Sequence, residues 1–215
     1  LSVQEFADSV YCHYEDTLFH RNIYLVPGLK TVNDDFSFVG NMRGEEIEII
    51  GTLDELRSKG ITHAALMMPG SHTHVTYVKD DVVSDIISNF TGELFYALKK
   101  ETIMAPVLSV EATADDLDPE MIHKALENLD RLGFNRSLYI CHAMRIMESG
   151  TPLQRFSYGE GVVNGGVRKS LEYYCEHFWK GCDTLVIVSD EFMYRLFSII
   201  FEGSPYIKNI VWMPI

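Results

Sequence analysis

The chain has 215 residues, 47% of them hydrophobic and 23% charged, so it is long enough to bury a core without disulfides or a structural metal. Its formal net charge of -13 argues against a broad nucleic-acid-binding surface, which needs clustered Lys and Arg. A small anionic ligand remains compatible with that charge, because a few local basic side chains and the backbone N–H groups at a helix start can hold one.

The first sixty residues are predicted to contain two helices and one strand. Apolar residues at helical spacing predict a helix over Val3–Tyr14, and Asn22–Pro27 has the composition of a buried strand. A polar loop around Asp34 follows. Met42 to Lys59 is predicted to form a second helix, which ends at Gly60. Its apolar face is expected to carry Ile47, Ile50 and Leu53.

Strands joined by tight turns dominate the next part of the chain. They are expected at Ile61–Met68, His72–Lys79 and Val82–Phe90, and Thr91 is expected to cap a helix that runs through Leu98. The remaining predicted helices and strands, in chain order, are helices at Pro119–Leu132, Arg136–Met147 and Gly159–Phe178, strand Thr184–Val188, helix Glu191–Phe201 and strand Asn209–Trp212. This order predicts an α/β protein with a mixed sheet flanked by helices, and it resembles the ribonuclease-H-like topology.

The cysteines and the hydropathy pattern bear on the compartment of the protein. Cys12, Cys141, Cys175 and Cys182 form no C-x-x-C pair, which suits a reducing cytoplasm, and Cys141 and Cys175 are expected to be small core residues. No apolar run of 18 residues predicts a membrane span. Because residue 1 is Leu rather than Met, we expect the chain to be part of a longer one.

Widespread nucleotide-binding motifs are absent. The sequence contains no G-x-x-x-x-G-K-[ST], no protein-kinase signature and no H-E-x-x-H. The glycines between Gly159 and Gly166 superficially resemble a dinucleotide fingerprint, but no strand precedes them and their spacing is wrong. We expect them to allow close helix packing, with approach of a ligand to the backbone as the alternative.

Two segments place polar residues and glycine at junctions between elements. In Met42–Glu46, a carboxylate on the first turn of a helix would be held ionised by backbone N–H groups, as a base must be, and a simple capping cluster is the alternative. In Met68–His74, a tight turn with glycine permits close approach of a phosphate, and an ordinary hairpin turn is the alternative. His72 and His74 face the same side of a strand, but no third ligand for zinc is evident.

A third segment, Phe90–Leu94, joins a strand to a helix. Thr91 as a cap and Glu93 as a partner of the helix dipole explain it structurally, and a direct ligand contact is the alternative.

Together, these segments resemble the 2-keto-3-deoxygalactonate kinase family. The family pattern has a strand ending in P-G-L, then M-R-G-E-E-T-Q, M-P-G-T-H-x-K-W and M-T-G-E-L before a leucine-rich helix. The matching residues here are Pro27–Leu29, Met42–Glu46, Met68–His72 and Thr91–Leu94. The resemblance is strong from about Asn22 to Leu98 and weaker through Asn135–Tyr173 to the end.

The resemblance implies an actin/hexokinase-like fold with two ribonuclease-H-like lobes and a cleft between them. Residues 1–41 would be the tail of an N-terminal substrate lobe whose first part is absent, and residues 42–215 would be the C-terminal nucleotide-binding lobe. The implied reaction transfers a phosphoryl group from Mg-ATP to the 6-hydroxyl of 2-dehydro-3-deoxy-D-galactonate. The implied partners are therefore a sugar acid and ATP, in the cytoplasm, without nucleic acid or membrane. Homodimer formation is left open.

The resemblance also implies roles for individual residues. Glu45 would be the catalytic base, with Glu46 as its alternative, and Arg43 would neutralise the substrate carboxylate or the transferred phosphoryl group. Substrate contacts are further expected from Glu46 and Glu93. The phosphate-binding turn would consist of Gly70, Ser71 and His72. No residue is assigned to a metal.

Several departures from the family pattern leave a second function open. The D-x-G-S/T strand turn is absent, Ile47-Glu48 replaces Thr-Gln, and His74-Val75 replaces Lys-Trp, which removes a fixed positive charge. Val186–Glu191 stands where relatives carry a glycine-containing adenosine segment. The alternatives are therefore a non-catalytic paralogue that binds a sugar acid or nucleotide, and a purely structural α/β domain.

Overall fold

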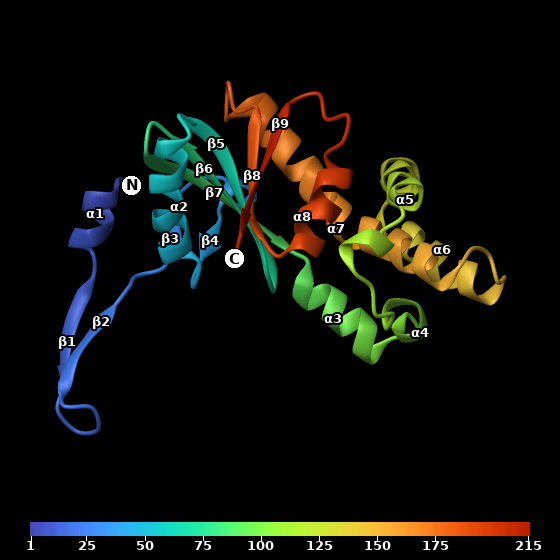
Figure 1. Cartoon of the computed structure of the whole chain (residues 1–215), viewed down its shortest axis with the longest axis horizontal. Coiled ribbons are helices and arrows are strands. Elements are labelled where there is room, and N and C mark those ends of the chain that lie inside the picture. The colour runs from blue at the N-terminus through green and yellow to red at the C-terminus, as the bar shows by residue number, and fades with distance from the viewer.

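The computed structural model describes all 215 residues, and its centre is a five-stranded mixed sheet (Figure 1). The strands are β5 (His63–Pro69), β6 (His72–Lys79), β7 (Val82–Phe90), β8 (Thr184–Ser189) and β9 (Asn209–Pro214). Their order is β7-β6-β5-β8-β9. The first three strands are antiparallel neighbours, whereas β8 runs parallel to β5 and to β9. The predicted mixed sheet is confirmed, and β6 and β7 have the predicted bounds.

One face of the sheet is covered by α2 (Glu46–Ser58). Its buried stripe consists of Ile49, Leu53 and Leu56, which pack against alternate residues of β5 such as Leu66. The prediction that Ile47 belongs to this stripe is wrong, since its side chain is 64% exposed. Six residues turn a helix by about 240°, so Ile47 cannot share a face with Leu53.

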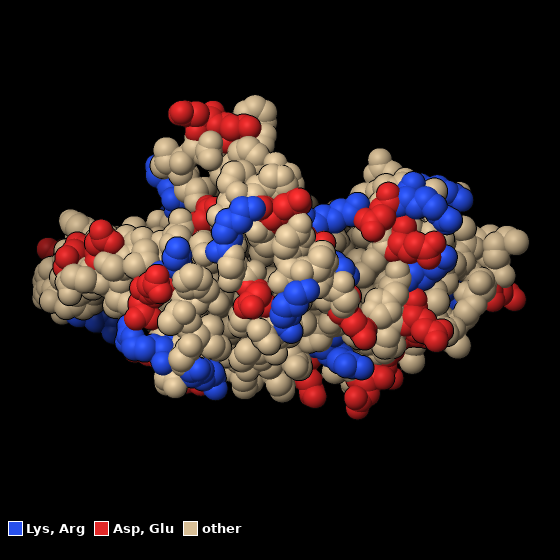
Figure 2. Space-filling model, turned by 90° about the horizontal axis from the view of Figure 1, so that it is seen from above, with Lys and Arg blue, Asp and Glu red and all other residues tan.

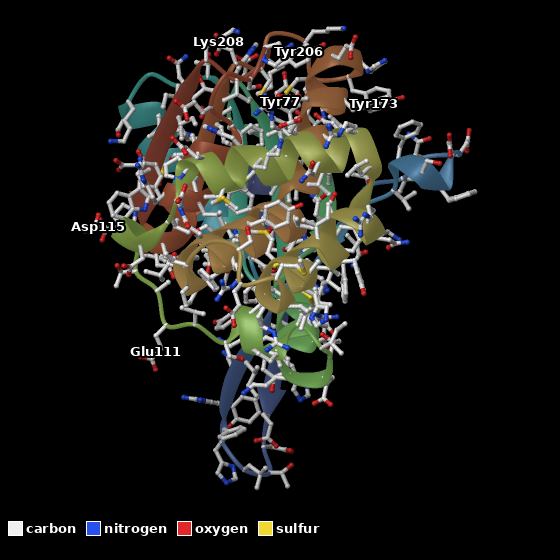
Figure 3. The ribbon with its side chains drawn as sticks, turned by 90° about the vertical axis from the view of Figure 1, so that its right-hand side faces the viewer. Tyr77, Glu111, Asp115, Tyr173, Tyr206 and Lys208 are labelled. Atoms are coloured by element: carbon white, nitrogen blue, oxygen red, sulfur yellow. The ribbon has the colours of Figure 1, made fainter.

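The opposite face is covered by α7 (Pro152–His177) and α8 (Glu191–Ile200). In this layer Tyr77 of β6, labelled in Figure 3, stacks on Trp179 with ring centroids 5.1 Å apart. The indole Nε1–H donates a hydrogen bond of 2.8 Å to Asp85. This contact links the segment after α7 to the edge strand β7.

A helical cluster extends the molecule beyond the sheet (Figure 1). It contains α3 (Gly92–Glu101), α4 (Ala105–Leu108), α5 (Pro119–Leu132) and α6 (Phe134–Ile146), which pack against α7. The prediction for α5 has the observed bounds, whereas the short α4 was not predicted. The loop between α4 and α5 carries Glu111 and Asp115, whose side chains point outward in Figure 3.

Three of the four glycines of α7 serve close packing, as predicted, whereas a Cβ on Gly166 would meet nothing within 4 Å. The helix begins at Pro152, seven residues before its predicted start at Gly159, because Thr151 caps it through a capping box. A Cβ atom on Gly161 would lie 2.8 Å from Cβ of Ala125 in α5, so the two backbones approach too closely for a side chain.

The N-terminal segment differs most from the prediction. A helix over Val3–Tyr14 is wrong beyond Asp8, because α1 (Val3–Asp8) ends at Ser9, whose hydroxyl and backbone N–H both donate to the carbonyl of Phe6. The strands β1 (Tyr11–Glu15) and β2 (Arg21–Leu25) then form a hairpin that projects away from the body (Figure 1). β2 overlaps the strand predicted at Asn22–Pro27. The prediction that this strand is buried is wrong, since most residues of β2 are exposed.

A second short pair of strands crosses the predicted boundary between residues 41 and 42. β3 (Leu29–Lys30) pairs antiparallel with β4 (Asn41–Met42), and short 3-10 turns lie at Phe36–Phe38 and Ala114–Asp116. The segment before the boundary is therefore joined by backbone pairing to the segment that leads into α2.

The burial of the cysteines agrees with their predicted core role. Cys141 and Cys175 are buried, and Cys12 is exposed. None of the helices has the length and apolar character needed to cross a bilayer.

Candidate active site

A glycine turn connects β4 to α2 and sets the direction of the residues around it. Gly44 has φ +127°, which side-chain-bearing residues rarely adopt. Its N–H donates a 2.7 Å hydrogen bond to Oε2 of Glu46, the first residue of the helix. Arg43, on the other side of the glycine, is exposed to solvent.

The two adjacent glutamates occupy different environments. Glu46 is only 4% exposed, and its bond to Gly44 fits the interpretation of a capping cluster. Glu45 is the N-terminal boundary residue of α2, but its side chain makes no capping hydrogen bond. Its Oε2 atom is buried without a hydrogen-bond partner and lies 3.9 Å from Nε2 of His74. Glu45 therefore accepts no hydrogen bond, whereas Glu46 accepts one from Gly44 through Oε2 and keeps Oε1 buried without a partner.

The turn between β5 and β6 is held in place by the start of α3. The Gly70 N–H donates to the His72 carbonyl at 3.0 Å, and the Glu93 N–H donates to the Ser71 carbonyl at 2.7 Å. Gly92 packs so closely on this turn that a Cβ there would lie 2.1 Å from the carbonyl oxygen of Gly70. The second and third sequence segments therefore form one unit.

Thr91 stands at the predicted N-terminal boundary of α3, but its side chain does not cap the helix. Its hydroxyl instead pairs with the hydroxyl of Thr73 at 2.8 Å. The predicted position is confirmed and the predicted capping bond is wrong. The hydroxyl pair ties the start of α3 to β6 directly behind the turn.

Four side chains form a row along the edge of the turn, and we call Glu45, His74, His72 and Glu93 the acid–histidine row. The rings of His72 and His74 are 5.9 Å apart, because residues two apart on a strand face the same side. At the far end, Nε2 of His72 lies 3.4 Å from a carboxylate oxygen of Glu93. The row connects the glutamate before α2 to the glycine turn and to α3.

Burial lowers the pKa of His74, and the nearby carboxylate of Glu45 opposes this effect by favouring the charged ring. His72 adds to the lowering, whereas Glu46 opposes it. The protonation of this ring therefore responds to its neighbours.

The predicted site residues are thus brought together in large part. Glu45 contacts His74, whose ring lies beside that of His72 in the glycine turn. Glu93 contacts His72 directly. Arg43 is next to Glu45 in the chain and makes none of these contacts. A separate cavity of about 620 Å³ is lined by Phe38, Asp85, Phe178 and neighbouring residues, and it contains none of the predicted site residues.

Residues 2–204 match the sequence model of the 2-keto-3-deoxy-galactonokinase family. The chain belongs to this family. It is 33% identical over 85 residues to a protein described as a probable 2-dehydro-3-deoxygalactonokinase of Rhizobium meliloti (strain 1021), a match that covers 40% of this chain and 26% of that protein.

A solved relative shares the fold of this member of the 2-keto-3-deoxy-galactonokinase family. It is a crystal structure of a protein from Sinorhizobium meliloti assigned the name 2-dehydro-3-deoxygalactonokinase, with a TM-score of 0.76 and 19% identity. The similarity covers 99% of this chain and 66% of the other. The chain therefore spans just under two thirds of the length of that relative.

Sequence reasoning missed two residues of the site. His74 was noted as a departure from the family pattern, yet it is the side chain that contacts Glu45. Ser88, opposite His74 on β7, bonds its Nδ1 at 2.9 Å. The period of two along β6 places His74 beside His72, but the neighbour on β7 becomes visible only through the strand register.

Proposed function

We propose that the protein is a sugar-acid kinase, which transfers the γ-phosphoryl group of ATP to the 6-hydroxyl of 2-dehydro-3-deoxy-D-galactonate in the cytoplasm. Membership of the family supports the reaction class. The observation that carries the assignment of the site is the free carboxylate of Glu45 in one row with the glycine turn.

The sheet supports a ribonuclease-H-like lobe as the finer description of the fold. Three antiparallel strands are followed by two strands that run parallel to β5, with helices on both faces. We propose that residues 42–215 form the nucleotide-binding lobe and that residues 1–41 belong to the substrate lobe. The β3–β4 pair would then lie at the junction between the lobes.

In the proposed mechanism, Glu45 accepts the proton of the substrate hydroxyl. The hydroxyl oxygen forms a bond to the γ-phosphorus while the bond from that phosphorus to the ADP oxygen breaks. Arg43 would pair with the substrate carboxylate or with the charge that spreads over the transferring phosphoryl group. Both residues flank Gly44, so one turn would position the base and the cation.

The phosphate turn would donate mainly through Ser71. The Gly70 N–H is already bonded to the His72 carbonyl. Ser71 is exposed and belongs to a turn that is held in place by α3. We therefore propose Ser71 and the ring of His72 as the donors to phosphate, with Gly70 providing the close approach.

Magnesium is proposed to arrive bound to the ATP phosphates. The chain has no group of three or more His, Cys, Asp or Glu side chains suited to holding a metal ion. Since Mg²⁺ in kinases is held largely by substrate phosphates and water, this composition fits Mg-ATP as substrate.

The charge distribution bears on how such anions approach. On the face in Figure 2, Lys and Arg are interspersed with Asp and Glu, without a continuous basic field. The net charge of -13 also repels anions at long range. Binding of ATP and a sugar acid would therefore depend on local hydrogen-bond donors. We expect attraction to a basic surface to contribute little to the association rate.

The test is an ADP-coupled assay of the complete protein with a panel of keto-deoxy sugar acids. Glu45→Gln is expected to reduce kcat by about 10²-fold or more, because it removes the proton acceptor. Glu48→Gln, an exposed glutamate on the same helix, is the matched control and is expected to keep full turnover. Full turnover in Glu45→Gln would show that the base is another group.

A non-catalytic paralogue is the second candidate, and the replacement of a lysine by His74 favours it. A binding protein of this kind would bind ATP or the sugar acid in calorimetry without forming ADP. Size-exclusion chromatography with light scattering would test whether the protein is a homodimer.

A further inference from the structure

The contacts of Ser88 define which nitrogen of His74 carries a proton. The Ser88 hydroxyl donates its single hydrogen to the backbone carbonyl of Asn41 at 2.8 Å. It can therefore only accept in its 2.9 Å contact with Nδ1 of His74, so Nδ1 is the protonated nitrogen of the neutral ring. The lone pair of neutral His74 then lies on Nε2.

That lone pair faces an acceptor. Nε2 lies 3.9 Å from Oε2 of Glu45, and this oxygen is buried without a hydrogen-bond partner. His74 is only 6% exposed, so bulk water does not separate the pair. Two acceptors that face each other away from water repel, and a single proton between them converts the contact to an attraction.

We propose that Glu45 and His74 share the proton taken from the substrate, and that His74 is a positioning residue that takes over this proton from Glu45 and, once charged, holds its carboxylate. The proposal rests on the proposed kinase function for its role in turnover. When the substrate oxygen bonds to phosphorus, its proton passes to Glu45 and then to Nε2 of His74, which becomes a cation beside the carboxylate. Release of that proton to solvent restores the pair.

The geometry defines what the transfer requires. A separation of 3.9 Å exceeds a hydrogen bond, so Glu45 must move toward the ring by about 1 Å. Its side chain is 25% exposed and makes no bond that resists this movement. His74, in contrast, is anchored through Ser88 to the backbone of β4.

The other groups that face His74 also influence its protonation. Glu45 and Glu46, at the start of α2, favour the charged ring, whereas His72 on the same strand disfavours it. Ser88 on β7 is neutral in both states. Because Glu45 exerts the largest of the charge effects, removing its charge should shift the titration of His74 more than any other single change.

Nitrogen NMR of the 215-residue chain tests the pair without any substrate. In the wild-type protein at a pH where His74 is neutral, we expect Nδ1 to carry the proton and Nε2 to be bare. Ser88→Ala should move the proton to Nε2. Glu45→Gln should lower the pKa of His74 by about one or more, and the control Glu48→Gln should leave it unchanged.

Two NMR outcomes would overturn the inference. The first is a wild-type ring with its proton on Nε2, which would show that the Ser88 bond runs in the opposite sense. The second is a titration of His74 that is the same in Glu45→Gln and Glu48→Gln. Both are independent of turnover, so they decide the inference even if the protein phosphorylates no sugar acid.

The kinetic test is the pH profile of kcat for the complete protein with ATP and its best sugar acid. His74→Gln can donate a hydrogen bond to Glu45 through its amide but cannot gain a proton. We expect kcat to fall at least about tenfold and the acid limb of the profile to move to lower pH. A fall in kcat with an unmoved acid limb would show a merely structural role. Absence of turnover in the wild-type protein would instead overturn the proposed function.

Discussion

Replacing Gly92 by alanine should disrupt the contact that locks the glycine turn onto α3. The added Cβ would lie 2.1 Å from the carbonyl oxygen of Gly70 and 3.3 Å from Cα of Ser71, both of them backbone atoms that no side-chain rotation can clear. Overpacking of this kind costs roughly 1–3 kcal/mol. Alanine recovers about 0.5–1 kcal/mol of helix preference. The expected net loss is up to about 2.5 kcal/mol, or a fall in Tm of up to about 10 °C for a chain of this size.

Gly51→Ala is the matched control for this experiment. Gly51 lies in α2, and a Cβ there would meet nothing within 4 Å. It should therefore gain about 0.5–1 kcal/mol from the same helix preference. Urea unfolding followed by circular dichroism measures both variants. Equal stability of Gly92→Ala and Gly51→Ala would refute the claim that the two backbones touch. If Ser71 donates to phosphate as proposed, Gly92→Ala should also raise the KM for ATP in the complete protein, because Ser71 moves with the turn.

Three further predictions concern buried groups. Gly161→Ala should lower stability by roughly 1–3 kcal/mol in urea unfolding, whereas Gly166→Ala, where a Cβ meets nothing within 4 Å, should not. Burial raises the pKa of Glu160 to about 8, so its contribution is complete below the unfolded value near 4.5 and is lost as the pH rises toward 8. Stability of the wild type relative to Glu160→Gln should fall over that window, and a constant difference would contradict this. Iodoacetamide at pH 8 should modify the exposed Cys12 first, since burial raises the pKa of Cys141 to about 12; mass spectrometry that finds Cys141 modified first would refute it.

The central strands could be predicted from the sequence because local chemistry marks their ends. Asp80 and Asp81 both have positive φ, a conformation that aspartate tolerates better than β-branched residues, and they separate two runs rich in such residues. The N-terminal hairpin could not be predicted in the same way. The apolar spacing that begins at Val3 continues into β1, although the helix ends at the bonds of Ser9 to Phe6.

The three segments of the site could be recognised because each pairs a glycine with polar residues at an element junction. The contact between Glu45 and His74 could not, since it depends on how β4 and α2 lie against β6 and β7. Which ring nitrogen of His74 carries the proton depends in turn on the strand register that places Ser88 opposite it. Local sequence therefore indicated which residues form the site, and tertiary packing decided which of them act on each other.

The division of roles between Glu45 and Glu46 leads to a final prediction. Glu46 accepts a hydrogen bond from Gly44 and is buried, so Glu46→Gln should weaken a charge-assisted bond and cost about 1.5 kcal/mol of stability. Glu45→Gln removes an unpartnered buried oxygen and leaves the Gly44 turn intact, so stability should stay the same or rise. Glu46→Gln should therefore be the less stable variant in urea unfolding, whereas Glu45→Gln should show the larger fall in kcat. If Glu45→Gln were the more destabilising of the two, Glu45 would be the residue that holds the turn, and its assignment as the free carboxylate would fail.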